Sequence, residues 1–223
     1  MPHARLHAHQ HALTRTRERR QRLAHEAARL MAEGGIRDYH QAKLKAAARL
    51  GITDDASLPR NREIEDALRE YQRLFRGDGQ RQALRERREA ALRALEFFAP
   101  WDARLVGAVL DGTADAHAPV CLHLHSDDPA SLAAFLADSG IPAQPRLRRV
   151  RLDRDRSADV DVWVFGADGL AFDLAVLPTL SLRQAPLSGV DEKPMTRASA
   201  TQLRALLAQD EIDAFEAGAH APR

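Results

Sequence analysis

Three side chains that can bind metal ions are spaced two residues apart near the middle of the chain. Cys121, His123 and His125 alternate with aliphatic residues, so on a strand these three share one face and the aliphatic side chains share the other. Thiolate and imidazole are ligands that zinc prefers. The spacing therefore allows a transition-metal site, with His117 or Asp173 as a fourth ligand. Neighbouring same-face positions on a strand lie about 7 Å apart, however, so three such side chains rarely all bind one ion. The alternative is that they are ordinary semi-buried polar residues.

A glycine-containing segment comes just before this strand. Residues 104–110 are apolar and β-branched enough for a buried strand, and Gly107 lies where a side chain would obstruct a group approaching the backbone. Gly112 and Thr113 then open a tight turn. The sequence predicts a strand, a turn and a second strand that has one face in the core and one polar face towards a cleft.

This stretch resembles the signature of the nucleotidyltransferase superfamily of the DNA polymerase beta type. In that signature a glycine–serine pair is followed five residues on by glycine–threonine, and then by a strand reading serine-aspartate-aliphatic-aspartate-leucine. Aligned without gaps, Gly107 and Ala108 fall on the first pair, and Gly112 and Thr113 fall on the second. The resemblance implies that these four residues shape a nucleotide-binding turn.

The acids of the signature are replaced in this chain. In the family the two strand aspartates hold Mg²⁺ ions that bridge the triphosphate, which requires hard anionic oxygens. Pro119 and Cys121 occupy their positions; the first has no ligand atom and the second offers a soft one. The third family carboxylate lies on a later strand, where it commonly activates the attacking hydroxyl, and Asp173 fits that place.

Asp173 lies in the second strand of a predicted β-hairpin. Residues 170–177 pair plausibly with residues 159–165 around a turn at 166–169 that contains two glycines. An antiparallel register about that turn puts Asp173 on the same face as Val162 and Val164. As an alternative to a catalytic role, Asp173 is a structural acid at a solvated sheet edge.

Three functions follow from these residues. Loss of two carboxylates favours a catalytically degenerate protein that binds a nucleotide or an RNA end beside the Gly107 and Gly112 turns, with little dependence on magnesium. The alternative is an active metal-dependent nucleotidyltransferase with a site rebuilt around Asp173, the strand histidines and either Asp127 or Asp128; Asp115 could also contribute, although turn acids usually cap their own backbone. The second alternative is a transition-metal-binding protein that uses Cys121, His123 and His125.

Other enzyme classes have little support in the sequence. The chain contains no GxxxxGK[ST], GxSxG, HExxH or GxGxxG motif. Cys121 is a poor candidate nucleophile, because the nearest histidines share its strand instead of approaching it from elsewhere.

Charge is distributed unevenly along the chain. Residues 1–100 hold 21 Lys and Arg against 14 Asp and Glu, whereas residues 101–223 hold 12 against 18. Basic clusters at 15–22 and 81–88 could bind the phosphates of RNA. Acids interrupt both clusters, so the pattern favours solvated helix faces or docking of the two halves on one another.

The elements that must position these residues divide the chain in two. We expect a disordered terminus at 1–12, a region of four helices at 13–100, a nucleotidyltransferase-like α/β domain with a small mixed sheet at 101–217, and a disordered end at 218–223, so the fold class is α+β. A closing helix begins after Ser199, with Gln202 completing a capping box. The long connection before it, residues 182–198, carries Arg183, Lys193 and Arg197, which could reach an anionic ligand.

The resemblance extends beyond the short motif. The stretches DYHQAKLKAAARLG, LPRNREIEDALREYQRLF and KPMTRA, at 38–51, 58–75 and 193–198, look like those of a little-characterised group of bacterial proteins with a helical N-terminal half and a nucleotidyltransferase-like second half. This wider resemblance implies an architecture and no assigned reaction.

Composition predicts a cytoplasmic protein. The first thirty residues hold no apolar run like that of a signal peptide, and no segment approaches the roughly twenty apolar residues needed to span a bilayer. The single cysteine excludes an internal disulfide, which is consistent with a reducing compartment.

Overall fold

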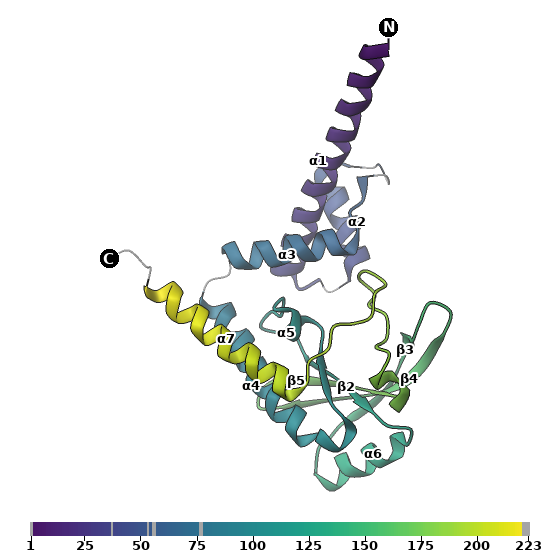
Figure 1. The fold of residues 1–223 in the computed structure, drawn as a ribbon, viewed down its shortest axis with the longest axis vertical. Coiled ribbons are helices and arrows are strands. Elements are labelled where there is room, and N and C mark those ends of the chain that lie inside the picture. The colour runs from purple at the N-terminus through teal and green to yellow at the C-terminus, as the bar shows by residue number, and fades with distance from the viewer. Residues whose placement is uncertain (1, 37, 53, 55–56, 76–77, 220–223) are drawn as a thin grey trace. The chain divides into compact units, whose positions relative to one another are not determined.

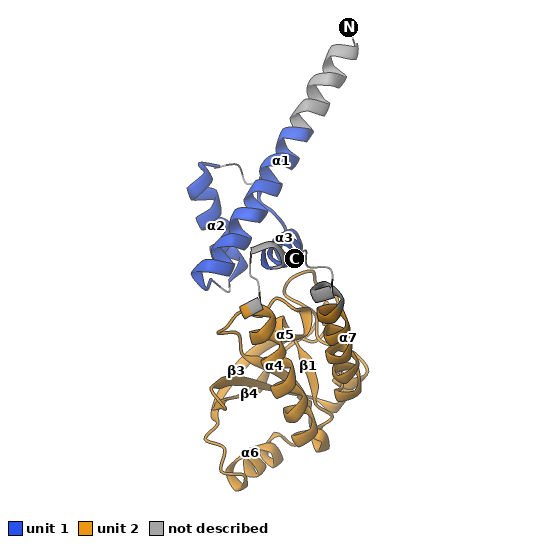
Figure 2. Cartoon of the chain, turned by 90° about the vertical axis from the view of Figure 1, so that its left-hand side faces the viewer, with its two compact units in different colours: residues 1–77 blue, residues 78–223 orange. Residues whose placement is uncertain are grey.

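The computed structural model of the chain describes residues 2–36, 38–52, 54, 57–75 and 78–219. It has the predicted α+β fold, with a helical N-terminal region followed by a mixed sheet and its helices (Figure 1). The chain forms two compact units, residues 1–77 and 78–223 (Figure 2). No helix among the described residues is long and apolar enough to cross a membrane.

The first unit contains three helices, α1 (Pro2–Gly34), α2 (Tyr39–Leu50) and α3 (Asn61–Phe75). Small and branched side chains bury each other completely where the helices meet, among them Leu23, Ala27, Ala46 and Ile64. The α2 helix begins at the predicted place because the Asp38 carboxylate accepts a hydrogen bond from the Gln41 N–H. The α1 helix begins much earlier than predicted, so it covers most of the stretch, residues 1–12, expected to be disordered.

The described part of the second unit contains the sheet and four helices of different lengths. Short 3₁₀ turns at Ala99–Trp101 and Thr179–Leu182 connect its parts. Its elements in chain order are α4 (Asp78–Phe97), β1 (Arg104–Val106), α5 (Ala108–Asp111), β2 (Val120–His125), α6 (Pro129–Asp138), β3 (Gln144–Arg151), β4 (Ser157–Ala167), β5 (Leu170–Leu177) and α7 (Ala200–Ala219).

Two boundaries differ from those predicted. Helix α4 belongs to the second compact unit, whereas composition places the change after Pro100. The strand expected over 104–110 ends at Val106, because Gly107 adopts φ 72° and ψ −155°, a conformation that leaves the strand and is open mainly to glycine. At the other end, residues 220–223 lie outside the described residues, so the predicted disorder there is not tested.

The sheet has the strand order β1-β2-β5-β4-β3, in which β2 and β5 are parallel and the other neighbours are antiparallel. The predicted hairpin is confirmed: β4 and β5 are joined by Asp168 and Gly169, both at positive φ, as a type I′ turn requires. Its register places Asp173 opposite Val164, which is the predicted face. On the other side Asp173 pairs with Cys121 of β2, a contact between segments that are distant in the sequence.

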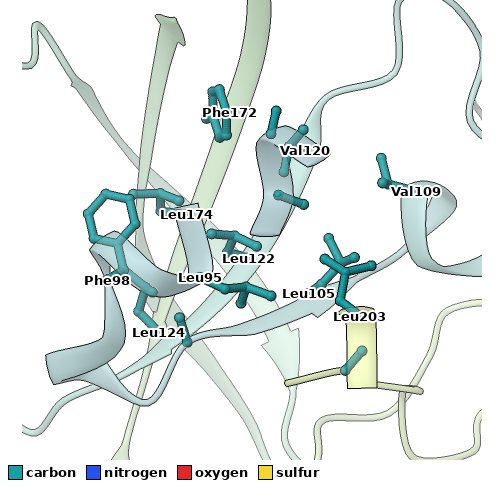
Figure 3. Packing of buried hydrophobic residues seen from close by; sticks show 14 of the residues in the cluster. Leu95, Phe98, Leu105, Val109, Val120, Leu122, Leu124, Phe172, Leu174 and Leu203 are labelled. Carbon is teal, nitrogen blue, oxygen red and sulfur yellow. The ribbon is translucent and has the colours of Figure 1, made fainter. Parts of the chain in front are cut away.

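One face of the sheet forms the main core. Leu122 and Leu124 from β2 and Leu174 from β5 are fully buried against Phe98 and against Leu203 of α7 (Figure 3). Helices α4 and α7 lie side by side on this face (Figure 1). The α7 helix begins as predicted, with Ser199 and Gln202 exchanging hydrogen bonds in a capping box.

Two arginines of α4 are buried and hold the irregular segment between β1 and β2. Arg87 donates to the carbonyl oxygens of Ala116 and Ala118, and Arg88 donates to those of Val109 and Leu110. The guanidinium of Arg88 also lies 2.5 Å from a carboxylate oxygen of Asp210 in α7. Both arginines belong to the cluster considered for RNA binding, but their donors are used inside the protein.

We expect Arg88→Met to lower the free energy of unfolding of the second unit by about 2–3 kcal/mol, because it leaves buried carbonyl oxygens without donors. Urea unfolding followed by tryptophan fluorescence measures this unit selectively, since both tryptophans, Trp101 and Trp163, lie in it. Arg85→Met is the matched control, because Arg85 is exposed on the same helix and pairs with Glu89 and Glu211 at the surface. Equal losses in the two variants would show that the Arg88 contacts do not stabilise the fold.

Candidate functional site

The sheet face opposite α4 and α7 carries the polar side chains that the sequence singles out. We call it the polar face and define it by Arg104 of β1, the three alternating residues of β2, Arg148 of β3, Asp173 of β5 and Arg197 from the connection after β5. The alternation along β2 is as predicted, since Val120, Leu122 and Leu124 lie in the main core while Cys121, His123 and His125 lie on the polar face.

Asp173 is held by an arginine from two strands away. Both guanidinium nitrogens of Arg148 donate to the Asp173 carboxylate, at 3.0 and 2.5 Å. The Asp173 side chain is 15% exposed and that of Arg148 is 48% exposed, so the pair is open to solvent on the arginine side. The hydrogen bonds to Asp173, together with the negative charge of the Cys121 thiolate form, raise the pKa of Arg148. Two-pronged pairing of this kind fixes the guanidinium plane.

The predicted nucleotide-binding turn reaches the same end of the sheet as this pair. Val106 is opposite Cys121 in the register, and Cys121 is opposite Asp173, so Gly107 follows directly beside both. Within the turn, however, the Thr113 N–H donates back to the carbonyl of Ala108. Gly112 adopts φ 77° and ends the short α5 helix. The sheet register thus brings Gly107, Cys121 and Asp173 together, while Thr113 helps close the turn itself.

His125 and Arg197 form a second polar cluster, at the opposite end of β2. Arg197 donates to the carbonyl oxygens of Ser181 and Leu182, at 2.6 and 3.0 Å, and approaches His125 Nε2 at 3.4 Å. Because a guanidinium can only donate, His125 Nε2 accepts, and the ring proton is on Nδ1, which lies 2.9 Å from the carbonyl oxygen of Asp102. Burial is the main cause that lowers the pKa of His125, which agrees with this neutral tautomer.

His123 lies between the two clusters and is almost completely buried. Its side chain is 6% exposed, and its Nδ1 has no hydrogen-bond partner. Burial lowers the pKa of His123 to about 3, and the nearby His125, Arg197 and Arg148 act in the same direction. Arg104 is its register partner on β1. His123 is therefore a neutral imidazole beneath a positively charged surface.

Positive charge exceeds negative charge on the polar face. Among the strand residues described on this face, Asp173 is the only acid, and Arg148 already occupies it. Among the residues that the structure describes, Arg197 contacts carbonyl oxygens and an imidazole but no carboxylate. Burial, followed by the nearby positive charge of Arg104, lowers the pKa of Arg197. Arg104 lies no closer than 3.9 Å to the exposed carboxylate of Asp102. This arrangement has the electrostatics of an anion-binding surface.

The structure does not gather the predicted metal ligands. Among the described residues, no three His, Cys, Asp or Glu side chains lie close enough to hold an ion. The zinc site of Cys121, His123 and His125 fails for the reason that strand spacing suggests, and His125 Nδ1 is already bonded to a carbonyl. The residues also do not fit the magnesium ions that the family resemblance implies, because Pro119 and Cys121 replace the acids and Arg148 occupies Asp173.

The other acids considered for a rebuilt site have local structural contacts. Asp127 accepts hydrogen bonds from the N–H and the hydroxyl of Thr179. Asp128 caps α6 by accepting from the Ala130 N–H. Asp115 accepts from the His117 N–H within its own turn, as expected for a turn acid. None of these contacts brings a second carboxylate next to Asp173.

Sequence reasoning missed Arg148 and Arg104, and it anticipated Arg197. A signal for Arg148 is present in the segment RLRRVRL, because Arg146 and Arg148 are two residues apart on a strand and so share a face. That spacing does not predict which strand pairs with the one that carries Arg146 and Arg148.

A scan against models of protein families, a search of curated proteins and a search of solved structures each found no match to this chain. The nucleotidyltransferase resemblance therefore stays a prediction from motif spacing.

The buried His123 is expected to make the second unit less stable in mild acid. The imidazole has a pKa of about 3 when folded and about 6.5 when unfolded, so below pH 6.5 only the unfolded state takes up the proton. Stability then falls with pH, by about 2 kcal/mol between pH 7.5 and 5.0, and His125 adds to the loss. Urea unfolding at both values measures it. His123→Leu should flatten the dependence, and His117→Gln, at an exposed histidine, should not. The same slope in His123→Leu as in the unmodified protein would exclude this cause.

Proposed function

We propose that the protein binds the phosphates of a nucleotide or of an RNA end on its polar face, and that it does not transfer the nucleotidyl group. The proposal combines the family resemblance with the charge of the face. Phosphate groups are recognised most specifically by arginine, whose planar guanidinium can donate two parallel hydrogen bonds. Three arginines, Arg104, Arg148 and Arg197, lie on the polar face, and each has N–H donors left beyond its contacts inside the protein.

The observation that carries the proposal is the Arg148–Asp173 pair beside Cys121 and Gly107. At the place where the family resemblance implies metal ions between carboxylates and phosphates, this chain has a guanidinium fixed on the remaining carboxylate. The Arg148 side chain is about half exposed, and the N–H groups that do not bond to Asp173 can donate to a phosphate. A fixed arginine supplies positive charge for binding but no ion to activate a nucleophile.

The incomplete neutralisation of Arg197 supports the same conclusion. An arginine that is partly removed from water and has no carboxylate is stabilised when an anion approaches. On the first unit, the exposed arginines of α1 at positions 15, 17, 19 and 22 are a separate candidate for contacts with RNA phosphates.

Active nucleotidyl transfer remains the competing hypothesis, and it requires a rearrangement. Asp173 would have to leave Arg148, and two further acids would have to join it from positions where Asp127 and Asp128 now bond to backbone groups. No contact of the described residues favours that arrangement, so transfer is treated as an outcome of the test.

Isothermal titration calorimetry with ATP, GTP, CTP and UTP, each in EDTA and in magnesium, tests the proposal. At least one nucleotide should bind with a Kd that differs by no more than about threefold between the two conditions, because no metal bridges it. Arg148→Gln should weaken binding about tenfold, which corresponds to the loss of one charge-assisted contact.

The matched control is Arg149→Gln. Arg149 is the next residue on β3, points to the other face and is well exposed, so its loss should leave the Kd unchanged. Equal binding by both variants would place the ligand elsewhere. Asp173→Asn should keep nucleotide binding, because it removes a negative charge from the face. Label transfer from an α-labelled nucleotide to RNA that is lost in Asp173→Asn would establish the competing enzyme instead.

A further inference from the structure

A separate pocket opens on the helix-covered side of the sheet, away from the polar face. It has a volume of about 320 Å³ and lies between α4, the β4–β5 hairpin and the segment after α6. Four phenylalanines contribute to its lining, Phe97, Phe98, Phe165 and Phe172. The volume is at the lower end of the range for small-molecule sites, about 300–1,000 Å³.

The phenyl rings give the pocket a shape that suits a flat apolar group. Phe165 and Phe172 are paired across the hairpin and stack with their centroids 5.1 Å apart and their planes inclined by 6°. Phe97 and Phe98 meet edge to face at 4.9 Å. Phe98, Phe165 and Phe172 are buried, whereas Phe97 is 46% exposed and leaves one wall open to solvent. An aromatic ring placed there can contact both faces and edges of the lining rings.

Two charged side chains border the pocket, and neither is neutralised within the part of the chain that the structure describes. Arg93 projects from α4 and Asp168 lies in the hairpin turn, and both are exposed. The hydrogen bonds and ion pairs of the described residues include neither of them. An unpaired guanidinium at the edge of an apolar pocket favours a carboxylate on the ligand, and a nearby aspartate disfavours a second negative charge.

We propose that this pocket binds a small aromatic monocarboxylate, with its ring among the four phenylalanines and its carboxylate at Arg93. The site is independent of the polar face, because Phe172 and Asp173 are consecutive on β5 and lie on opposite faces of the sheet. The single negative charge distinguishes this ligand from a nucleotide.

Titration of the full chain with 3-phenylpropionate, followed by ligand-observed NMR and calorimetry, tests the proposal. The carboxylate should bind about tenfold more tightly than 3-phenylpropionamide, which has the same ring and chain but no charge. Arg93→Gln should remove this preference. Equal affinity for the acid and the amide in the unmodified protein, or no binding of either, would overturn the proposal.

The Asp168→Asn variant should not weaken binding of the carboxylate, in contrast to Arg93→Gln. Asparagine tolerates the positive φ of this turn position, and it removes the like charge, so binding of the carboxylate should stay equal or tighten. Weaker binding of 3-phenylpropionate in Asp168→Asn would contradict the proposal, because removal of a like charge cannot disfavour a carboxylate.

The Ala94→Leu variant tests whether the ligand binds inside the pocket. Ala94 lines the cavity from α4, and leucine preserves helix propensity while it fills the space that the ring would occupy. This variant should lose binding at least tenfold and melt at the same or a higher temperature. Undiminished binding by a folded Ala94→Leu protein would show that the carboxylate binds elsewhere.

Discussion

The alternation of side chains along β2 and β5 is the constraint on which both candidate sites depend. Because these strands lie side by side and in parallel, each contributes a continuous apolar row to one face of the sheet. On the other face β2 contributes a polar row, whereas β5 contributes Asp173 followed by Ala175 and Leu177, which pack in a second apolar cluster. On β5 a single step along the backbone separates Phe172, in an aromatic pocket, from Asp173, in a charged cluster. A shift of one residue in the pairing would bury the acid in the core, so the aliphatic row of β2 fixes the register and with it the position of the chemistry.

Arginines that donate to backbone carbonyls are the second recurring device of this fold. Arg87 and Arg88, which are buried, and Arg197, which is partly buried, each donate to two or more carbonyls of a loop, a short helix or a 3₁₀ turn. Such segments cannot satisfy their own carbonyl groups, and one guanidinium with five donors can serve several of them at fixed angles, which an ammonium group cannot do. Arg87 and Arg88 bond the β1–β2 segment to α4, whereas Arg197 bonds the residues after β5 to His125. The abundance of arginine therefore partly reflects loop architecture instead of nucleic-acid binding.

Local patterns predicted those parts of the fold that depend on neighbouring residues. Period-two alternation identified the two faces of β2, the Asp168–Gly169 turn identified the hairpin, and the spacing of Ser199 and Gln202 identified the start of α7. The adjacency of β2 and β5 was not accessible in this way, because Cys121 and Asp173 are 52 positions apart in the chain. The reach of Arg148 across β4 depends on the pairing of β3 with β4, which the spacing of the arginines does not identify, so the ion pair could not be foreseen. Periodicity also does not distinguish an exposed arginine from a buried one, as Arg85 and Arg88 illustrate.

The Arg148–Asp173 pair also bears on how far the polar face departs from a metal-dependent site. Each oxygen of Asp173 accepts one hydrogen bond from a single guanidinium, which leaves a lone pair on each oxygen but fixes a positive charge beside the carboxylate, where a metal cation would be repelled. An acid at position 121 alone would add negative charge next to Arg148 and give the arginine a second carboxylate partner, which would strengthen the ion cluster before any metal bound. The absence of acids at Pro119 and Cys121 and the pairing of Arg148 with Asp173 thus act in the same direction, because each one makes the face less suited to metal ions and more suited to binding an anion directly.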